Sequence, residues 1–282
     1  MQFSLIVATI NRVETLDRLL KSLGEQRYTD FEVIIADQNS DQRLLPVVER
    51  YSAALRLKHL RARHGLSAAR NDGLQPAQGE VVAFPDDDCW YVAETLSRIA
   101  AWMNSHPQSA VLSVACCDRD GRPSVQNWPL KPARITPRSL WRRAVSIGLF
   151  IRRDEIAKIG GFDESLGAGS SSPWGSGEET DLLLRLLAAG VNAEYLPELL
   201  VGHANPTEND AEAAAARALA YGRGLGRVLA KHRRPLNEKA TVLLRPLGGA
   251  LISGIRGQWS RSRYYQQSFR GRWQGLRGAI TE

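Results

Sequence analysis

The stretch Val81-Val82-Ala83-Phe84-Pro85-Asp86-Asp87-Asp88 carries the clearest structural signal in this chain. Apolar residues that favour β-structure run directly into three carboxylates, which is typical of a buried strand that ends at the protein surface. Open α/β sheets bind their ligands at this end of their strands. In an extended chain Asp86 and Asp88 leave the backbone on the same side, so they can share one cation.

Three adjacent acids repel one another unless a divalent metal or a basic ligand offsets their charge. Hard oxygen donors suit Mg2+ or Mn2+. A solvated acidic turn after the strand accounts for the same residues, and the stretch alone does not decide between the two interpretations.

Strand and helix patterns alternate on the N-terminal side of this stretch. Apolar, β-rich segments at Phe3–Thr9, Phe31–Asp37 and Leu57–Leu60 are each followed by a loop and a segment with helical spacing of apolar residues. This alternation predicts an α/β fold with a Rossmann-like, mostly parallel sheet flanked by helices and joined by right-handed crossovers.

The pattern continues on the C-terminal side. We expect a helix at Ala93–Met103, strands at Ala110–Cys116, Ser146–Arg152 and Ala193–Leu196, and a Gly/Ser-rich loop over residues 160–177. Glu178-Glu179-Thr180-Asp181 then opens a helix. Acids in a first helical turn interact favourably with the helix dipole, so capping is one explanation for this cluster. A functional role is the other, because capping does not require a Gly/Ser loop beside the acids.

Length and composition set limits. The 282 residues suffice for one large α/β domain, or one domain with a smaller appendage. No run of eighteen apolar residues occurs, so we expect no membrane-spanning helix, and the first residues do not resemble a signal peptide. The three cysteines form no disulfide or zinc pattern, which favours a reducing cytoplasm.

The charge is unevenly distributed. Of the 37 Lys and Arg residues fourteen follow Glu212, but only two of the 30 acids do. The net charge of +7 therefore arises in the tail, which suits a polyanion, either a nucleic acid or an anionic membrane surface. A helix is expected at Ala211–Ala230, broken near its three glycines, and Thr241–Ile255 is apolar but too short to span a bilayer.

Six motifs in order resemble those of a family-2 glycosyltransferase with the GT-A fold, over roughly residues 1 to 205. The resemblance implies a GT-A catalytic domain at residues 1–210 and a helical, basic and aromatic C-terminal extension at 211–282. The motifs are Val7-Ala8-Thr9-Ile10-Asn11-Arg12, Asp37 with Asn39-Ser40, Ala69-Arg70-Asn71, Asp86-Asp87-Asp88, Gly160-Gly161-Phe162-Asp163 and Glu178-Glu179-Thr180-Asp181.

The resemblance implies a nucleotide-sugar donor, most often a UDP-sugar, and a divalent metal cofactor, Mn2+ or Mg2+. Asp88 and Asp86 would be metal ligands, and His203 occupies the place of a further ligand or diphosphate contact, although a lone histidine often has no special role. Arg70 is expected to face the diphosphate or to order the Asp86 loop, or else to be a surface charge. The other residues assigned to substrate binding are Thr9, Asn11, Arg12, Glu14, Asp37, Asn39, Asn71, Asp86, Asp87 and Asp181.

The acceptor hydroxyl must lose its proton as it attacks the anomeric carbon, and a carboxylate is the usual base. By resemblance this role falls to Glu179, the second member of the acidic pair. Because the pair is Glu-Glu where the family commonly has Glu-Asp, Glu178 remains an alternative. A single base implies inversion. Trp174 would stack on a sugar face or pack in the interior.

The tail interleaves arginines with aromatic residues, which suits the headgroup region of an anionic membrane. We therefore expect a peripheral enzyme at the inner face of the cell membrane that acts on a glycan or lipid-linked acceptor in cell-surface polysaccharide synthesis. A helical appendage that packs on the catalytic domain or on a second subunit is the alternative; nucleic acid is not an expected partner, and the oligomeric state is open.

Two other functions account for part of the pattern. A sugar nucleotidyltransferase also uses acidic metal ligands, but the segment Ala8–Glu14 lacks the Gly-rich loop and lysine that it needs. A non-catalytic nucleic-acid-binding protein would explain the basic tail but not carboxylates at three strand or helix ends.

Overall fold

The computed structural model describes residues 1–204 and 210–278. The chain divides into two compact units. The first consists of Met1–His64, Ala68–Phe162 and Leu182–Pro206, and the second of Gly65–Ser67, Asp163–Asp181 and Thr207–Glu282. The C-terminal segment therefore shares a unit with the Gly/Ser-rich loop.

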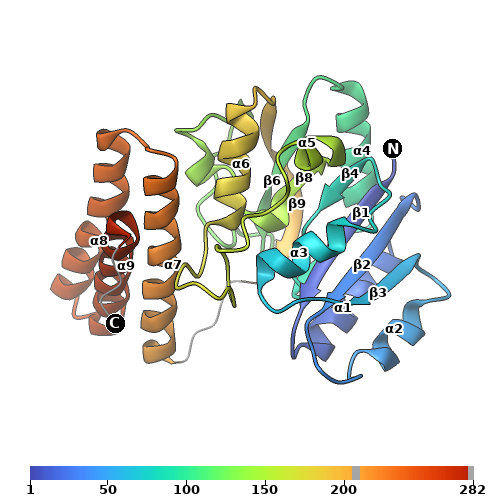
Figure 1. The fold of residues 1–282 in the computed structure, drawn as a ribbon, viewed down its shortest axis with the longest axis horizontal. Coiled ribbons are helices and arrows are strands. Elements are labelled where there is room, and N and C mark those ends of the chain that lie inside the picture. The colour runs from blue at the N-terminus through green and yellow to red at the C-terminus, as the bar shows by residue number, and fades with distance from the viewer. Residues whose placement is uncertain (205–209, 279–282) are drawn as a thin grey trace. The chain divides into compact units, whose positions relative to one another are not determined.

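The first unit is built on a nine-stranded sheet in the order β3-β2-β1-β4-β8-β6-β9-β5, with β7 paired to β9. Figure 1 shows β3, β2, β1 and β4 side by side. The strands are β1 (Phe3–Thr9), β2 (Phe31–Asp37), β3 (Leu57–Arg61), β4 (Val81–Ala83), β5 (Cys89–Trp90), β6 (Val111–Cys117), β7 (Ala133–Arg134), β8 (Leu149–Arg152) and β9 (Ala193–His203).

The strands β3, β2, β1 and β4 are parallel, as the alternating pattern predicts. Every residue of β2 is buried, which explains why the segment from Val33 to Ala36 is continuously apolar and does not alternate with polar residues. In the other half, β8 runs antiparallel to both β4 and β6, whereas β6 and β9 are parallel. The predicted α/β fold with a mostly parallel sheet is confirmed. The departures from a purely parallel arrangement are β8 and the two-residue strands β5 and β7, which both pair antiparallel with β9.

Helices accompany the sheet. Leu16, Leu19, Leu20 and Leu23 form the buried face of α1, at the spacing that the sequence shows. The expected strand at Ser146–Arg152 is shorter, because Ser146–Gly148 forms a 3-10 turn. The helices that precede β9 in the chain are α1 (Val13–Gly24), α2 (Leu45–Tyr51), α3 (Leu66–Leu74), α4 (Thr95–Ser105), α5 (Arg153–Lys158) and α6 (Glu178–Ala188), of which α3 and α6 begin with residues of the second unit.

The second unit contains α7 (Ala211–Lys231), α8 (Leu236–Ile255) and α9 (Trp259–Arg277), and α9 packs against both of the others. The expected break in α7 near its glycines is wrong, because the helix is continuous. A Cβ on Gly226 would lie 2.1 Å from the Arg272 carbonyl oxygen, and one on Gly275 would lie 2.0 Å from that of Arg223. The glycines thus let two helix backbones approach closely.

Helix α8 continues through Pro246, which cannot donate the hydrogen bond that the carbonyl of Val242 would otherwise accept. The guanidinium of Arg272 on α9 donates to that carbonyl instead, at 2.5 Å. Burial lowers the pKa of Arg272 to about 10. This arginine therefore holds the helices together. Among the described residues no helix is long and apolar enough to span a bilayer.

Candidate functional site

The acidic stretch forms a tight turn between β4 and β5. Phe84 is fully buried, and the backbone N–H of Cys89 donates to the carbonyl of Asp86 at 3.1 Å. The side chains of Asp86 and Asp88 are 41% and 32% exposed. They lie together as predicted, but a hydrogen-bonded turn brings them together and not an extended chain.

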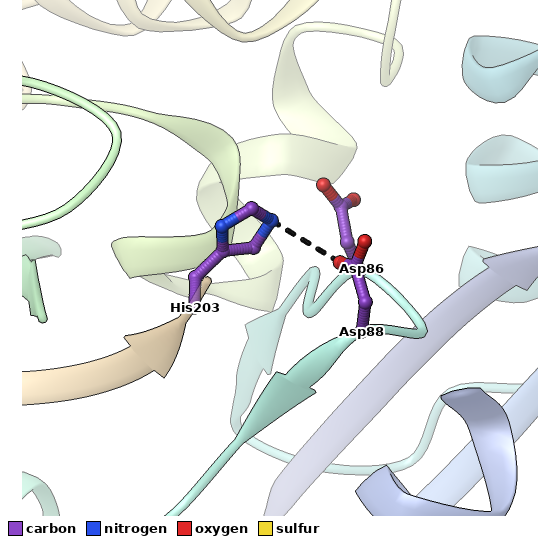
Figure 2. A group of neighbouring side chains, drawn as sticks. All are labelled: Asp86, Asp88 and His203. Carbon is purple, nitrogen blue, oxygen red and sulfur yellow. Dashed lines mark ion pairs between the residues drawn. The ribbon is translucent and has the colours of Figure 1, made fainter. Parts of the chain in front are cut away.

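His203 joins these two acids through the pairing of β5 with β9. Cys89 pairs with His203, the last residue of β9, so the histidine lies beside Asp88. Its Nε2 atom is 3.1 Å from Oδ1 of Asp88 (Figure 2). Trp90 pairs with Gly202, and a Cβ on this glycine would lie 2.1 Å from the Trp90 ring. The glycine before the histidine is therefore required by packing.

Asp86, Asp88 and His203 fit a divalent metal. One ligand atom from each lies within 4.8 Å of the others. Oδ1 of Asp88 and Nδ1 of His203 are buried and form no hydrogen bond of good geometry within the described residues. Carboxylate oxygens suit Mg2+ and Mn2+, and an imidazole nitrogen suits first-row transition metals. The three residues predicted as metal ligands therefore form a donor set that suits a divalent ion.

The surroundings shift the pKa values of the two acids in opposite directions. His203 and Arg12 lower the pKa of Asp88 to about 2, so this carboxylate is ionised at neutral pH. Burial raises the pKa of Asp86, and Arg70 opposes that effect. The His203 pKa is raised: burial acts to lower it, and the ion pair with Asp88 prevails.

Asp87 lies outside this cluster and is buried. It accepts a hydrogen bond of 2.6 Å from the Thr9 hydroxyl and one of 3.3 Å from Arg12, whose guanidinium also donates to Asp88 at 2.7 Å. Burial raises the pKa of Asp87 to about 6, although Thr9 and Arg12 act to lower it. Asp87 thus fixes the acidic turn to the end of β1.

The predicted nucleoside residues gather at the carboxyl ends of β1 and β2. Thr9 pairs with Asp37, and Asp37 pairs with Arg61, so the three lie in one row across the sheet. The Asp37 carboxylate is fully buried and accepts hydrogen bonds from Asn39 and Arg61. Nε2 of His59 is 2.9 Å from its Oδ2 atom.

Asn39 links this row to the loop before α1, because its Oδ1 atom accepts from the backbone N–H of Asn11 at 2.8 Å. Asn11 has a φ of 58°, a conformation that asparagine tolerates better than most residues. Glu14 is exposed in the first turn of α1, where a carboxylate stabilises the helix N-terminus. His59 and Arg61 were not among the predicted site residues. The available signal was their position at the carboxyl end of the third predicted strand, beside the strand that ends at Asp37.

Arg70 is not a surface charge, since it is 1% exposed. Its guanidinium lies 5.8 Å from the ring centroid of Phe84 and 5.5 Å from that of Phe162, and it donates to Asp86 at 3.2 Å. The side chain amide of Asn71 donates to the carbonyl of Phe162 and accepts from its N–H. This pair of residues therefore orders the acidic turn and the chain at Gly161.

Four predicted residues lie in the second unit. Glu178 is buried, and a Cβ at Gly167 would lie 3.4 Å from its carboxylate oxygen. Glu179 is half-buried in the first turn of α6. Trp174 is half-buried too, with the guanidinium of Arg227 5.7 Å from its ring centroid. Glu179 is therefore the more accessible of the two glutamates.

Asp181, the fourth, is fully buried and held by α7. Nζ of Lys231 lies 2.7 Å from Oδ1 of Asp181 and 2.6 Å from Oδ2 of Asp163, and Nε2 of His232 lies 2.7 Å from Oδ1 of Asp181. Neither basic residue was predicted, because no local pattern links Asp181 to residues 50 and 51 positions further along the chain. They fix the turn in which Glu178 and Glu179 begin α6.

We expect Lys231→Met to lower the free energy of unfolding by about 2 kcal/mol, because it leaves a buried carboxylate with less compensation. His232 keeps the loss below that of a fully unpaired charge. Lys239→Met on α8 is the matched control and should change the unfolding free energy little, since Lys and Met have similar helix propensities. Denaturant unfolding measures both; equal values for the two variants would contradict a structural role for Lys231.

Comparison with known proteins gives a consistent result. The sequence profile of glycosyl transferase family 2 matches residues 4–154. TarS, a poly(ribitol-phosphate) beta-N-acetylglucosaminyltransferase of Staphylococcus aureus, is 37% identical over 117 residues, which are 40% of this chain and 20% of TarS. The GalNAc(5)-diNAcBac-PP-undecaprenol beta-1,3-glucosyltransferase of Campylobacter jejuni is 33% identical over 102 residues, 35% of this chain and 33% of that protein. The matches thus span only a fifth and a third of these relatives.

Solved structures share the fold. The crystal structure of S. aureus TarS 1-349 in complex with UDP-GlcNAc aligns with a TM-score of 0.60 and 21% identity, over 96% of this chain and 92% of that one. The mannosyltransferase PcManGT from Pyrobaculum calidifontis, in complex with GDP-Man and Mn2+, aligns with a TM-score of 0.66 and 18% identity, over 98% and 87%. At these identities the likeness shows the fold, which is GT-A as predicted.

Proposed function

Because the chain belongs to glycosyl transferase family 2, we propose that it moves a sugar from a nucleoside-diphosphate sugar, with UDP favoured, to a hydroxyl of a glycan or lipid-linked acceptor, with inversion. The observation that carries the donor half of this proposal is the cluster of Asp86, Asp88 and His203 at the carboxyl end of the sheet. Such an edge is where open α/β sheets bind nucleotides.

The donor diphosphate becomes a leaving group that gains negative charge. A divalent metal, when bound at the cluster, would neutralise part of that charge. Asp88, Asp86 and His203 would hold it. Arg70 keeps Asp86 in place, and Arg12 is half-exposed beside Asp88, where its guanidinium is available to a phosphate oxygen. The nucleoside would lie along Thr9, Asn11, Asp37 and Asn39, at the ends of β1 and β2.

The acceptor hydroxyl requires a base. We assign Glu179, because its carboxylate is more accessible than the buried Glu178. Glu179 would accept the proton as the hydroxyl oxygen attacks the anomeric carbon and the bond to the diphosphate breaks. With one base and a single displacement, the configuration at the anomeric carbon inverts. Asp181 and Trp174 would support the acceptor side, Asp181 by fixing the first turn of α6.

The acceptor is proposed from the relatives and from the tail. TarS is named for a poly(ribitol-phosphate) acceptor and the Campylobacter enzyme for an undecaprenol-linked one, so a polymeric or lipid-linked glycan is the acceptor class that we propose for this chain. The basic and aromatic C-terminal extension suits a membrane surface. We place the protein at the inner face of the cell membrane, where a lipid-linked acceptor would be presented.

Calorimetric titration with UDP and with GDP, each with and without Mn2+, tests the donor half. We expect UDP to bind at least about tenfold more tightly with Mn2+, since a metal held by Asp86, Asp88 and His203 would offset the negative charge of the diphosphate. If GDP bound in place of UDP, the proposed nucleotide would change from uridine to guanosine diphosphate and the proposed reaction class would stay the same. If neither nucleotide bound, the proposal would fail, and incubation with a nucleoside triphosphate and a sugar phosphate would reveal a nucleotidyltransferase by released pyrophosphate.

A further inference from the structure

Helix α8 presents large aliphatic side chains on its solvent side. Leu244, Leu247, Leu251 and Ile255 follow one another at intervals of three or four residues, so they lie on one face of the helix. They are between 40% and 78% exposed, and neighbouring Ile252 is 53% exposed. The opposite face, which includes Leu243, Pro246 and Ala250, is buried. A helix that packs on one side only normally carries polar residues on the other.

The surroundings of this face are cationic. Between Lys239 and Gly278 the sequence has no Asp or Glu, but eight Lys or Arg residues. Arg272 is used in helix packing, whereas most of the others are exposed. The exposed ones are Arg245, Arg256, Arg261, Arg263, Arg270 and Arg277, and Lys239 is half-buried.

Two clefts lie where α8 turns into α9. One, of about 140 Å³, is lined by Gly249, Ile252, Ser253, Arg256, Gln258, Arg261 and Tyr265. The other lies along residues 257–261, beside Trp259, which is 73% exposed. Two guanidinium groups in one small cleft can bind a phosphate by charge-assisted hydrogen bonds. An exposed tryptophan next to them is typical of a side chain at a lipid–water interface.

We propose that the exposed face of α8 and the turn into α9 bind the surface of an anionic phospholipid bilayer. Leu251, Ile255 and Trp259 would enter the interfacial layer, and Arg256 and Arg261 would bind a lipid phosphate. The charge pattern favours this partner over a second copy of the chain, whose cationic face would be repelled. Membrane binding itself is argued from this surface alone. Its role, bringing the enzyme to a lipid-linked acceptor, rests on the proposed function.

Vesicle co-sedimentation of the full chain tests the proposal. Wild type should bind vesicles of phosphatidylglycerol and phosphatidylcholine, bind phosphatidylcholine alone far more weakly, and dissociate with added salt. Leu251→Glu with Ile255→Glu should weaken binding at least about tenfold, and Arg256→Gln with Arg261→Gln about tenfold. The matched controls are Leu130→Glu, an exposed leucine of the first unit, and Arg18→Gln with Lys21→Gln on α1; both should bind as wild type does.

The proposal would be overturned if wild type did not bind anionic vesicles, or if the α8 variants bound them as tightly as wild type does. It would also be overturned if the Leu251/Ile255 variant changed from dimer to monomer on gel filtration while its vesicle binding stayed unchanged. Glycerol phosphate that competed fully with vesicles would assign the arginine cleft to a soluble phosphate and also overturn it. UDP titration of each variant separates the two proposals, because vesicle binding without UDP binding would reject the enzymic proposal alone.

Discussion

Asp88→Asn is expected to reduce sugar transfer about a thousandfold, equivalent to about 4 kcal/mol of transition-state stabilisation. Asp88 is the acid whose pKa is lowered to about 2, and it lies between His203 and Arg12. The amide keeps the shape of the side chain but removes the negative charge that a divalent metal needs. The enhancement of UDP binding by Mn2+ should be lost together with turnover, and both are measured on the same preparation.

Asp154→Asn is the matched control, because this aspartate is 86% exposed and its ion pair with Arg153 is long, at 4.0 Å. It should change neither turnover nor Mn2+ dependence. Thermal unfolding of both variants separates lost function from lost structure. An Asp88→Asn protein that folded, bound UDP with Mn2+ and turned over as wild type does would remove Asp88 from the metal site.

Glu179→Gln is expected to lower turnover by a factor of roughly 100 to 10,000, the usual contribution of a general base, while UDP binding stays within about twofold of wild type. The glutamine has the same size but cannot accept the acceptor's proton. Because Glu179 is half-buried at the start of a helix, the fold should tolerate the change. Turnover and calorimetric UDP binding, measured together, distinguish a lost base from a lost donor site.

Glu178→Gln serves as the neighbouring control. This residue is buried against the backbone at Gly167, so we expect its substitution to lower the free energy of unfolding by about 1 to 3 kcal/mol more than Glu179→Gln does. If Glu178→Gln instead abolished turnover in a stable protein and Glu179→Gln remained active, the two roles would be exchanged.

The sequence alone determined the parallel half of the sheet and the position of its acidic edge. The strand segment Phe31–Asp37 is buried on both faces, so it is apolar from Val33 to Ala36 without alternation and ends at the carboxylate of Asp37. The amphipathic face of α1 is equally legible, because four leucines at helical spacing are all buried. These features depend on neighbours within one element, and local periodicity records them.

Other features followed only from the tertiary structure. The glycines of α7 are typical of a helix break, but Gly222 and Gly226 lie against the backbone of α9 and Gly224 lies against the backbone of Ser176. Close packing therefore outweighs their low helix propensity. His203 lies beside Asp88 because β5 pairs with the end of β9, and Lys231 lies beside Asp181 although 50 residues separate them. For Arg70 the sequence left open a diphosphate contact, a role in ordering the Asp86 loop and a surface charge, and only the structure shows that it is buried against Phe84 and Phe162.

The difference has a physical cause. Periodicity and turn residues report interactions between residues a few positions apart, which every helix and strand repeats along its length. A metal cluster, a buried ion pair or a close helix crossing depends on which distant segments the completed sheet and helix packing bring together. For this chain, the sequence therefore specified the strand ends and the acids they carry, whereas strand pairing and helix packing decided which residues became their partners.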